Sequence, residues 1–121
     1  MDPRQIANTY YDAWINRHGD MSQVPLAEDL VFRGPVASFD SAEDYRAMAR
    51  QAGAAVTSFR VRYQLSDGDR VCSVVDWTMQ PVPGTLSAAE VLEIRDGQIV
   101  RSELFYDAEE LRKAMAQSPT G

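Results

Sequence analysis

The first segment of the chain has a helical spacing of apolar side chains. They recur three or four residues apart along one face: Ile6, Tyr10, Ala13 and Trp14. Asp2 is a favourable N-cap, and Pro3 suits the first helical position because its missing N–H costs nothing there. Gly19 can adopt the left-handed conformation that ends helices. The spacing therefore predicts a helix from Asp2-Pro3 to His18-Gly19.

A short strand and a second helix are expected next. The apolar run at residues 30–33 reads as a strand, and Gly34-Pro35 breaks it. Two overlapping pairs then resemble capping boxes: Asp40 with Glu43, and Ser41 with Asp44. The apolar face that follows ends at Gly53, so the second helix is predicted to run from this double cap to that glycine.

From Val56 onward the period changes from that of a helix to that of strands. Four extended segments are predicted: 56–65, 71–80, 86–95 and 99–106. Asp67-Gly68 and Asp96-Gly97 are hairpin turns, and a Pro- and Gly-containing turn at residues 81–84 joins the middle pair. A last helix is predicted from Asp107 to about Ala116, with Glu110 placed for a capping box.

This order of elements predicts the fold class. Three consecutive hairpins give an antiparallel meander, and the N-terminal helices must cover one of its faces. A twisted sheet covered in this way curves, and its concave side can hold a ligand. We therefore expect one α+β domain over residues 1–121, a cone-shaped half-barrel with the N-terminal helices packed on the concave face of its sheet.

The register of tight hairpins predicts which side chains share a face. One face would collect aromatic, aliphatic and acidic residues: Phe59, Val61, Tyr63, Cys72, Val74, Asp76, Ala88, Glu90, Leu92, Glu103, Phe105 and Asp107. We expect this face to line the pocket. The opposite face is also apolar, and a second copy of the chain is the simplest cover for it. The sequence thus predicts a homodimer through the outer sheet face.

Composition and charge narrow the classes of function. The net charge of −6 and the lack of a dense basic cluster argue against a nucleic-acid partner. No run of 18 apolar residues and no secretory signal is visible, and the lone Cys72 cannot form an internal disulfide, so a cytoplasmic protein without membrane spans is expected. No metal-ligand spacing, phosphate loop or dinucleotide fingerprint is present, so neither a metal nor a cofactor is expected.

The acids of the predicted pocket face are the candidates for chemistry. Glu90 in an apolar pocket would have a raised pKa and could donate a hydrogen bond to a developing oxyanion, or it could simply pair with Arg101. Asp107 is either a helix cap, an acid/base group, or both. Asp76 and Glu103 are further acidic candidates, or rim charges if the register differs. Residues expected to contact the substrate are Tyr10, Trp14, Phe32, Tyr63, Glu103 and Phe105.

Four segments carry a resemblance to a known family: YYDAWINRHGD, LAEDLVFRGP, SAEDYRAMAR and RDGQIVRSELFYD. Through them the chain resembles the nuclear transport factor 2-like superfamily, and more closely its SnoaL-like branch. The resemblance implies a pocket for a small molecule. It leaves the activity open, because the superfamily includes ketosteroid isomerases, limonene-type epoxide hydrolases, polyketide cyclases, dehydratases and members that only bind.

Residue by residue, the resemblance is partial. Asp107 matches the acid/base Asp of SnoaL-like cyclases and one Asp of the epoxide hydrolases, and Glu90 matches the protonated Asp of the isomerase oxyanion hole. Other positions depart from these families. The isomerase base corresponds to Gly34, and its oxyanion Tyr falls near Asp12. The remaining departures concern the epoxide-hydrolase Arg and the cyclase His: Val74 occupies the Arg position if Asp76 is the second Asp, and the chain's one His is His18.

The sequence therefore supports three hypotheses of function. The first is a cofactor-independent acid/base enzyme of the isomerase, cyclase, dehydratase or epoxide hydrolase type, acting on a small hydrophobic molecule with Asp107, Glu90 and Asp76 as its catalytic residues. The second is a ligand-binding or accessory domain without catalysis. The third is a protein-interaction module that uses its apolar outer face.

Overall fold

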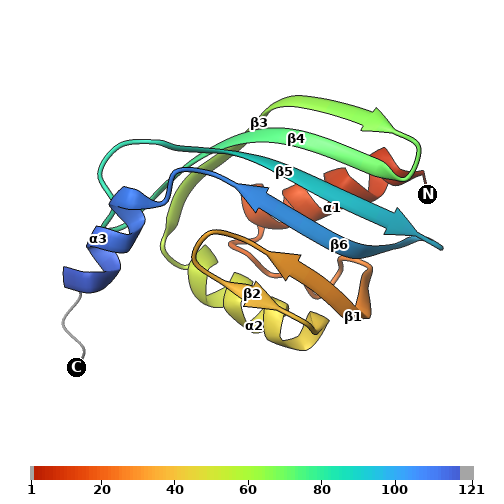
Figure 1. Cartoon of the computed structure of the whole chain (residues 1–121), viewed down its shortest axis with the longest axis horizontal. Helices are drawn as coiled ribbons and strands as arrows, with labels where there is room; N and C mark the ends of the chain where they lie inside the picture. Colours follow the sequence, from red (N-terminus) through yellow and green to blue (C-terminus); the bar gives the residue numbers. More distant parts are fainter. Residues whose placement is uncertain (1, 118–121) are drawn as a thin grey trace.

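A computed structural model describes residues 2–117, which form three helices and six strands (Figure 1). The elements follow the chain in this order: α1 (Pro3–Asn16), β1 (Leu26–Arg33), β2 (Ser38–Phe39), α2 (Ala42–Gly53), β3 (Val56–Asp67), β4 (Arg70–Met79), β5 (Leu86–Arg95), β6 (Gln98–Phe105) and α3 (Glu109–Gln117). The expected α+β architecture is thereby confirmed.

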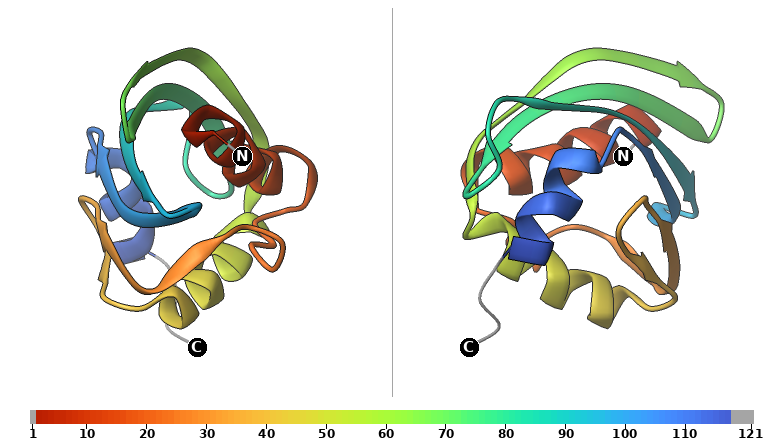
Figure 2. Two further views of the ribbon diagram at one scale, coloured as in Figure 1. Left: turned by 90° about the vertical axis from the view of Figure 1, so that its right-hand side faces the viewer. Right: turned by 60° about the vertical axis from the view of Figure 1, so that its left-hand side comes forward.

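The six strands form one curved sheet that does not close into a barrel. Its order is β2-β1-β6-β5-β4-β3, and every neighbouring pair is antiparallel except β1 and β6. Figure 2 shows the sheet arching around the interior, with α1 inside the arch and α2 beside β1. The parallel pair and the two-residue β2 were not foreseen, since β1 returns beside β6 only after the whole meander has formed.

The two N-terminal helices begin at the caps that the sequence predicts. The Asp2 side chain accepts a hydrogen bond from the Gln5 backbone N–H, and Gln5 completes the capping box. Ser41, one of the two candidate caps, accepts from the Asp44 backbone N–H at the start of α2. The helices then meet closely at their ends, where a Cβ on Gly19 would lie 2.1 Å from the Ala49 carbonyl oxygen. Glycine is therefore required where the turn after α1 crosses α2.

Two of the register shifts in the sheet decide which of the predicted pocket residues reach the concave face. One lies in β3, where Val61 pairs with Val75 but Tyr63 pairs with Val74, so one extra residue is inserted. The other lies at the start of β6, where Ile94 pairs with Ile99 but Glu93 pairs with Arg101. Each inserted residue shifts the alternation beyond it by one and exchanges the two faces.

The predicted pocket face is therefore wrong in part. Glu90, Ala88 and Leu92 face the interior as expected, but their neighbours on β4 and β6 are the residues assigned to the opposite face. Ser73 pairs with Glu90 on one side, and Leu104 pairs with it on the other. Besides the two bulges, the β4–β5 connection is a source of error in the predicted facing, because its irregular turn does not fix the register as a two-residue hairpin would.

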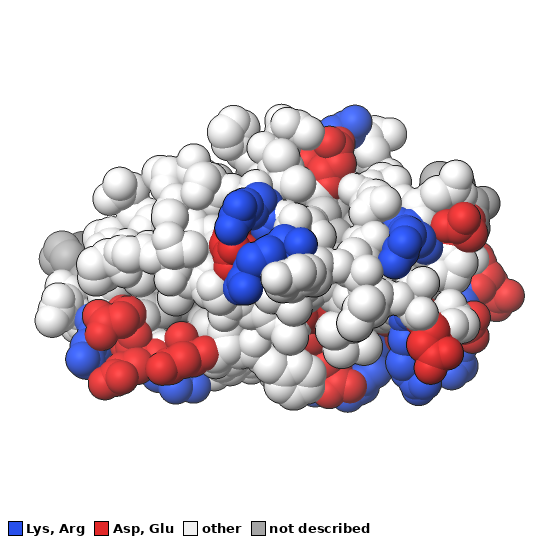
Figure 3. All heavy atoms as spheres, turned by 90° about the horizontal axis from the view of Figure 1, so that it is seen from above, with Lys and Arg blue, Asp and Glu red and all other residues white. Residues whose placement is uncertain are grey.

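The outer face of the sheet carries several side chains that the sequence placed in the pocket. Tyr63 and Phe105 are both more than half exposed there, as is Leu65 of the same outer face. Near the middle of the largely uncharged face over β3 and β4, basic side chains gather around an acidic one (Figure 3). The group includes Arg62, whose guanidinium lies 3.1 Å from a carboxylate oxygen of Asp76. That a second copy covers this face stays a prediction.

Candidate functional site

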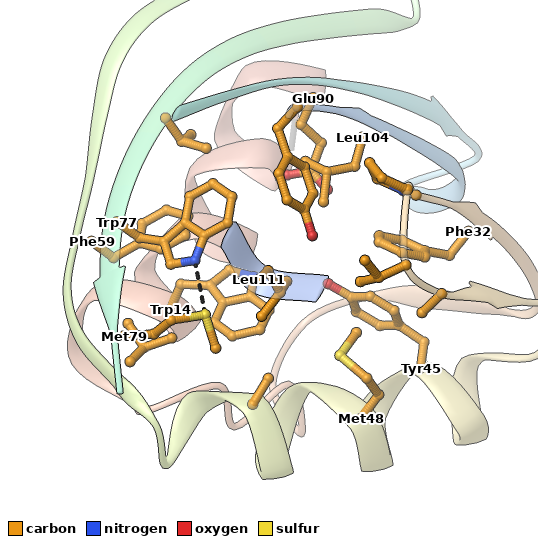
Figure 4. A pocket seen from close by; sticks show the side chains of 18 of the residues that line it. Trp14, Phe32, Tyr45, Met48, Phe59, Trp77, Met79, Glu90, Leu104 and Leu111 are labelled. Atoms are coloured by element: carbon orange, nitrogen blue, oxygen red, sulfur yellow. Dashed lines mark hydrogen bonds between the residues drawn. The ribbon is translucent and has the colours of Figure 1, made fainter. Parts of the chain in front are cut away.

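An apolar cavity of about 150 Å³ lies between the concave face of the sheet and the helices (Figure 4). Three aromatic rings form one wall. The rings of Trp14 and Phe59 stack with centroids 5.9 Å apart, and Phe59 in turn stacks on Trp77 at 6.4 Å. A cavity on the order of 150 Å³ can hold a molecule the size of benzene. The space therefore suits a ligand of about one ring.

The opposite wall comes from β1 and α2. Phe32 packs against Tyr45 with ring centroids 4.9 Å apart, and Met48 lies one turn further along α2. Figure 4 shows the hydroxyl of Tyr45 pointing into the cavity. The Tyr45 hydroxyl is thus a polar group on an otherwise apolar wall.

The loop at residues 34–37 and helix α3 lie at one end of the cavity. Leu111 of α3 reaches the cavity lining, and the Arg112 guanidinium donates a 2.7 Å hydrogen bond to the Pro35 carbonyl. No residue of α3 is fully buried, and its Lys113 pairs only with acids of the same helix among the described residues. The helix is therefore a lightly attached cover for this end.

Glu90 is the one carboxylate in the described lining of this cavity. It is only 3% exposed, and it lies at the middle of β5. Three hydroxyl groups donate to it: Tyr10 at 2.8 Å, Ser102 at 2.7 Å and Tyr11 at 3.0 Å. All three donors are neutral, and among the described residues no cation hydrogen-bonds the carboxylate. A buried carboxylate without a counter-ion is costly, so the arrangement calls for an explanation beyond packing.

A second phenol extends this network to the cavity. The hydroxyl of Tyr10, besides meeting Glu90, is hydrogen-bonded to the hydroxyl of Tyr45. Tyr10 comes from α1, Tyr45 from α2 and Glu90 from β5. Three elements far apart in sequence thus join in a chain from the buried acid to the hydroxyl that Figure 4 shows facing the cavity.

Burial is the main influence on the proton affinities in this cluster. It raises the pKa of Glu90, and the hydrogen bonds from Ser102, Tyr10 and Tyr11 oppose that rise only in part. Burial and the nearby Glu90 charge raise the pKa of the Tyr10 and Tyr45 phenols, which therefore stay protonated. The carboxyl of Glu90 is the group whose proton is exchanged most easily.

Four of the predicted site residues line the cavity: Tyr10, Trp14, Phe32 and Glu90. The alternative pairing of Glu90 with Arg101 is wrong, because Arg101 instead contacts Glu103 at 3.2 Å on the outer face. Trp14 forms part of one wall through its stack on Phe59, and Phe32 contributes to the other wall.

Asp76 lies on the outer face, away from the cavity. Its carboxylate is held by Arg60 and Arg62 and by a 2.6 Å hydrogen bond from Ser87. The hydrogen bonds from Ser87 and Arg62 lower the pKa of Asp76, which keeps it ionised. The expected place of Asp76 in the pocket is corrected: it is the centre of a surface ion cluster.

The remaining predicted residues also lie outside the cavity. Tyr63 and Phe105 are 62% and 56% exposed on the outer face, and Glu103 pairs there with Arg101. Asp107 is exposed, and its carboxylate accepts a 3.0 Å hydrogen bond from the Glu109 backbone N–H at the start of α3. The structure thus gives Asp107 the position of a helix cap, and the bulge in β6 turns Glu103 and Phe105 outwards.

Other residues of the cluster were not predicted from the sequence. They are Tyr45, whose hydroxyl meets that of Tyr10, and Ser102, which donates to Glu90. Tyr106 also lines the cavity, and burial raises its pKa. One usable signal existed: Ser73 and Ser102 are small polar residues at the buried, otherwise apolar positions of their strands, and such residues often serve a buried polar partner.

Within residues 2–117 no three His, Cys, Asp or Glu side chains are grouped so that they could hold a metal ion. None of the helices in the same range is long and apolar enough to cross a membrane.

Several solved structures share the fold of this chain. Three solved structures are similar over most of their length: an NTF2-like protein of unknown function from Cytophaga hutchinsonii (19% identity, TM-score 0.80, 93% of this chain and 96% of that one), an LEH-like epoxide hydrolase from M. tuberculosis (18%, 0.72, 95% and 90%), and a protein with a ketosteroid isomerase-like fold from Catenulispora acidiphila in complex with trimethylamine (17%, 0.73, 94% and 92%). At these identities the likeness shows the fold alone.

Comparison of sequences identifies the family of the chain. No curated protein matches the chain. The sequence model of the SnoaL-like domain, however, matches residues 7–102. This range runs from within α1 to the middle of β6 and includes Tyr10, Tyr45 and Glu90. The chain belongs to the family of SnoaL-like domains.

Proposed function

We propose that this protein is a cofactor-independent enzyme that moves a proton on a small, largely apolar molecule, with Glu90 as its acid/base group. One observation carries the proposal. Glu90 is buried at an apolar cavity, accepts hydrogen bonds only from hydroxyl groups within the described part of the chain, and has a raised pKa. Folding places a carboxyl at high cost where a bound molecule would meet it, and perturbed acids of this kind concentrate at functional sites.

The number of carboxyl groups narrows the reaction. Asp76 and Asp107 lie outside the cavity, so a mechanism with two carboxylates is not supported. One carboxyl can give its proton to an oxygen of the bound molecule and then take a proton back from a carbon of the same molecule. Such a cycle leaves Glu90 unchanged, and it serves an isomerisation or a dehydration.

Epoxide hydrolysis is less well supported, although one similar structure is that of an epoxide hydrolase. That reaction adds a water, which needs a group to position and activate it besides the acid that protonates the oxygen. The described lining of the cavity holds no second carboxylate and no arginine. The geometry therefore favours reactions whose atoms all come from the bound molecule.

The test is a product analysis on one-ring compounds. The protein is incubated with cyclic unsaturated ketones, alcohols and epoxides, and products are separated and weighed by mass spectrometry. We expect a product of unchanged mass or one lighter by a water molecule. Glu90→Gln should lower the rate by about 10²–10⁴-fold, the usual contribution of acid/base catalysis. The matched control is Tyr63→Phe on the outer face, which should retain the full rate.

A second function is favoured by the same carboxylate count. A cavity with a single carboxyl can bind a ligand without changing it, as a ligand-binding or accessory domain would. Molecules that bind in the cavity and stabilise the protein against unfolding, but are converted no faster than in buffer alone, would support this function over catalysis.

A further inference from the structure

The hydrogens of the Glu90 network can be counted because each phenol carries one. The Tyr10 hydroxyl contacts both Glu90 and Tyr45, so it can donate to only one of them. When Glu90 is ionised, it must accept from Tyr10, and Tyr45 must then donate to Tyr10. All the hydrogens of the chain therefore point from the cavity towards Glu90.

In this ionised state Tyr45 offers a ligand only lone pairs. Its one hydrogen is committed to Tyr10, although Figure 4 shows its oxygen facing the cavity. A ligand that can donate, such as an alcohol, fits this state. A ligand that can only accept, such as a ketone, would bring two acceptor oxygens together in an apolar space, which is unfavourable.

A ketone at Tyr45 reverses the whole chain. Tyr45 turns its hydrogen to the ketone, and Tyr10 turns its hydrogen to Tyr45. The 2.8 Å contact between Tyr10 and Glu90 then keeps a hydrogen only if the carboxyl supplies it. Glu90 must therefore be protonated in this complex.

We infer that the chain Glu90–Tyr10–Tyr45 couples the choice of ligand to a proton: ligands that only accept hydrogen bonds bind with uptake of one proton on Glu90, and ligands that can donate bind without it. The inference rests on the proposed use of this cavity, and it assigns Tyr45 as the residue that meets the ligand's oxygen.

The side chains around Glu90 are neutral, so they do not take part in the proton uptake. The side chains that face it or its donors are Tyr10 and Tyr11 from α1, Tyr45 from α2, Ser73 from β4 and Ser102 from β6. None of these groups is charged at neutral pH. Among the described residues no ionised side chain stands within this network to supply the proton in place of Glu90.

The experiment compares two probes of one size, cyclohexanone and cyclohexanol. The ketone only accepts, whereas the alcohol can donate or accept. Binding is followed between pH 5 and pH 9 through the fluorescence of Trp14 and Trp77, which line the cavity. Calorimetry in two buffers with different ionisation enthalpies counts the protons taken up.

For the ketone we expect uptake of one proton above the native pKa of Glu90, with a Kd that rises about tenfold per pH unit. For the alcohol we expect no uptake and a Kd that is constant within about twofold, since the chain accommodates it in either direction. Ketone binding with a constant Kd and no proton uptake would overturn the coupling while leaving the cavity as a binding site. Failure of both probes to bind would overturn the proposed function as well.

Three variants separate the effect of the Glu90–Tyr10–Tyr45 hydrogen-bond chain from that of the rest of the cavity. Glu90→Gln supplies an amide hydrogen at every pH, so ketone binding should lose its pH dependence. Tyr45→Phe removes the contact with the ligand and should abolish the same dependence. Tyr106→Phe is the matched control, because it removes another phenol hydroxyl of the lining, one that does not belong to the hydrogen-bond chain. This control should keep the proton uptake, and its loss there would contradict the inference.

Discussion

The Tyr10 hydroxyl donates a 2.8 Å hydrogen bond to Glu90 and thereby ties α1 to the centre of β5. Both side chains are almost completely buried, at 2% and 3% exposure. The contact has a structural and a chemical side, since it anchors the helix within the arch and also holds the carboxyl at the cavity. Substitutions at the two ends separate these effects.

Tyr10→Phe should lower the stability of the protein. The change leaves a buried carboxylate oxygen with one donor fewer and removes the partner of the Tyr45 hydroxyl. A loss of this kind costs about 1–3 kcal/mol. Urea unfolding measures it, with Tyr63→Phe on the exposed outer face as the control, and equal midpoints for the two variants would contradict the expectation.

Glu90 should make the stability fall with rising pH over a defined window. Folding raises the pKa of Glu90, so the native state binds this proton more tightly than the unfolded chain does. Stability is therefore lost as pH rises from the unfolded value of about 4.3 to the native pKa, and it levels off above that point.

The comparison with Glu90→Gln isolates this contribution. Unfolding free energies of both proteins are measured in urea from pH 4 to pH 9. The difference between the two curves should change within the window and be flat above it. Curves that stay parallel throughout would show that Glu90 has the same proton affinity in both states.

Asp76 should act in the opposite direction and without any effect on the cavity. Hydrogen bonds from Ser87 and Arg62 lower its pKa, so the stability that it contributes is present above the unfolded pKa and is lost as pH falls through the native one. Asp76→Asn should lessen acid sensitivity and leave ligand binding unchanged. Altered binding of the one-ring probes in this variant would place Asp76 nearer the site than its ion cluster indicates.

Arg112 should affect how fast a ligand leaves. Its hydrogen bond to the Pro35 carbonyl joins α3 to the loop at the same end of the cavity. Arg112→Ala should speed ligand release several-fold in stopped-flow fluorescence and change the unfolding midpoint little, because α3 buries no residue fully. Lys113→Ala on the same helix is the control, and equal release rates for the two variants would count against α3 as a cover.

The outer face gives a test of assembly. Tyr63, Leu65 and Phe105 are exposed there in the single chain, and the sequence predicts that a second copy covers the outer face of the sheet. Under this prediction the protein is a dimer in light scattering, and Leu65→Asp converts it to a monomer by placing a charge in the apolar contact. A wild-type monomer would refute the prediction.

Most of the fold could be predicted because its signals are local. The caps at Asp2 and Ser41, the Asp96-Gly97 turn and the change of period at Val56 each depend on a few neighbouring residues. The parallel pairing of β1 with β6 could not be seen in this way, since it joins strands separated by the whole meander.

The site was harder to predict because it depends on register. The turn at Asp96-Gly97 was placed correctly, yet one bulge three residues later exchanges the faces of β6. Glu90 was assigned correctly because it lies on β5, before that bulge. Glu103 and Phe105 lie after it and were assigned wrongly. A bulge leaves no fixed mark in the sequence, so facing is the least predictable property of such a strand.

The bulge in β6 also bears on how such a cavity can change during evolution. With the bulge, Glu90 lies opposite Leu104; if the same residues paired as a regular ladder from Asp96-Gly97, Glu103 would lie opposite Glu90. Two acids facing each other in an apolar space share a proton and separate into an acid and a base. A one-residue slip of β6 that takes Val100 into the regular ladder would thus convert a single-acid cavity into a two-acid one, whereas deletion of Val100 would keep Leu104 opposite Glu90.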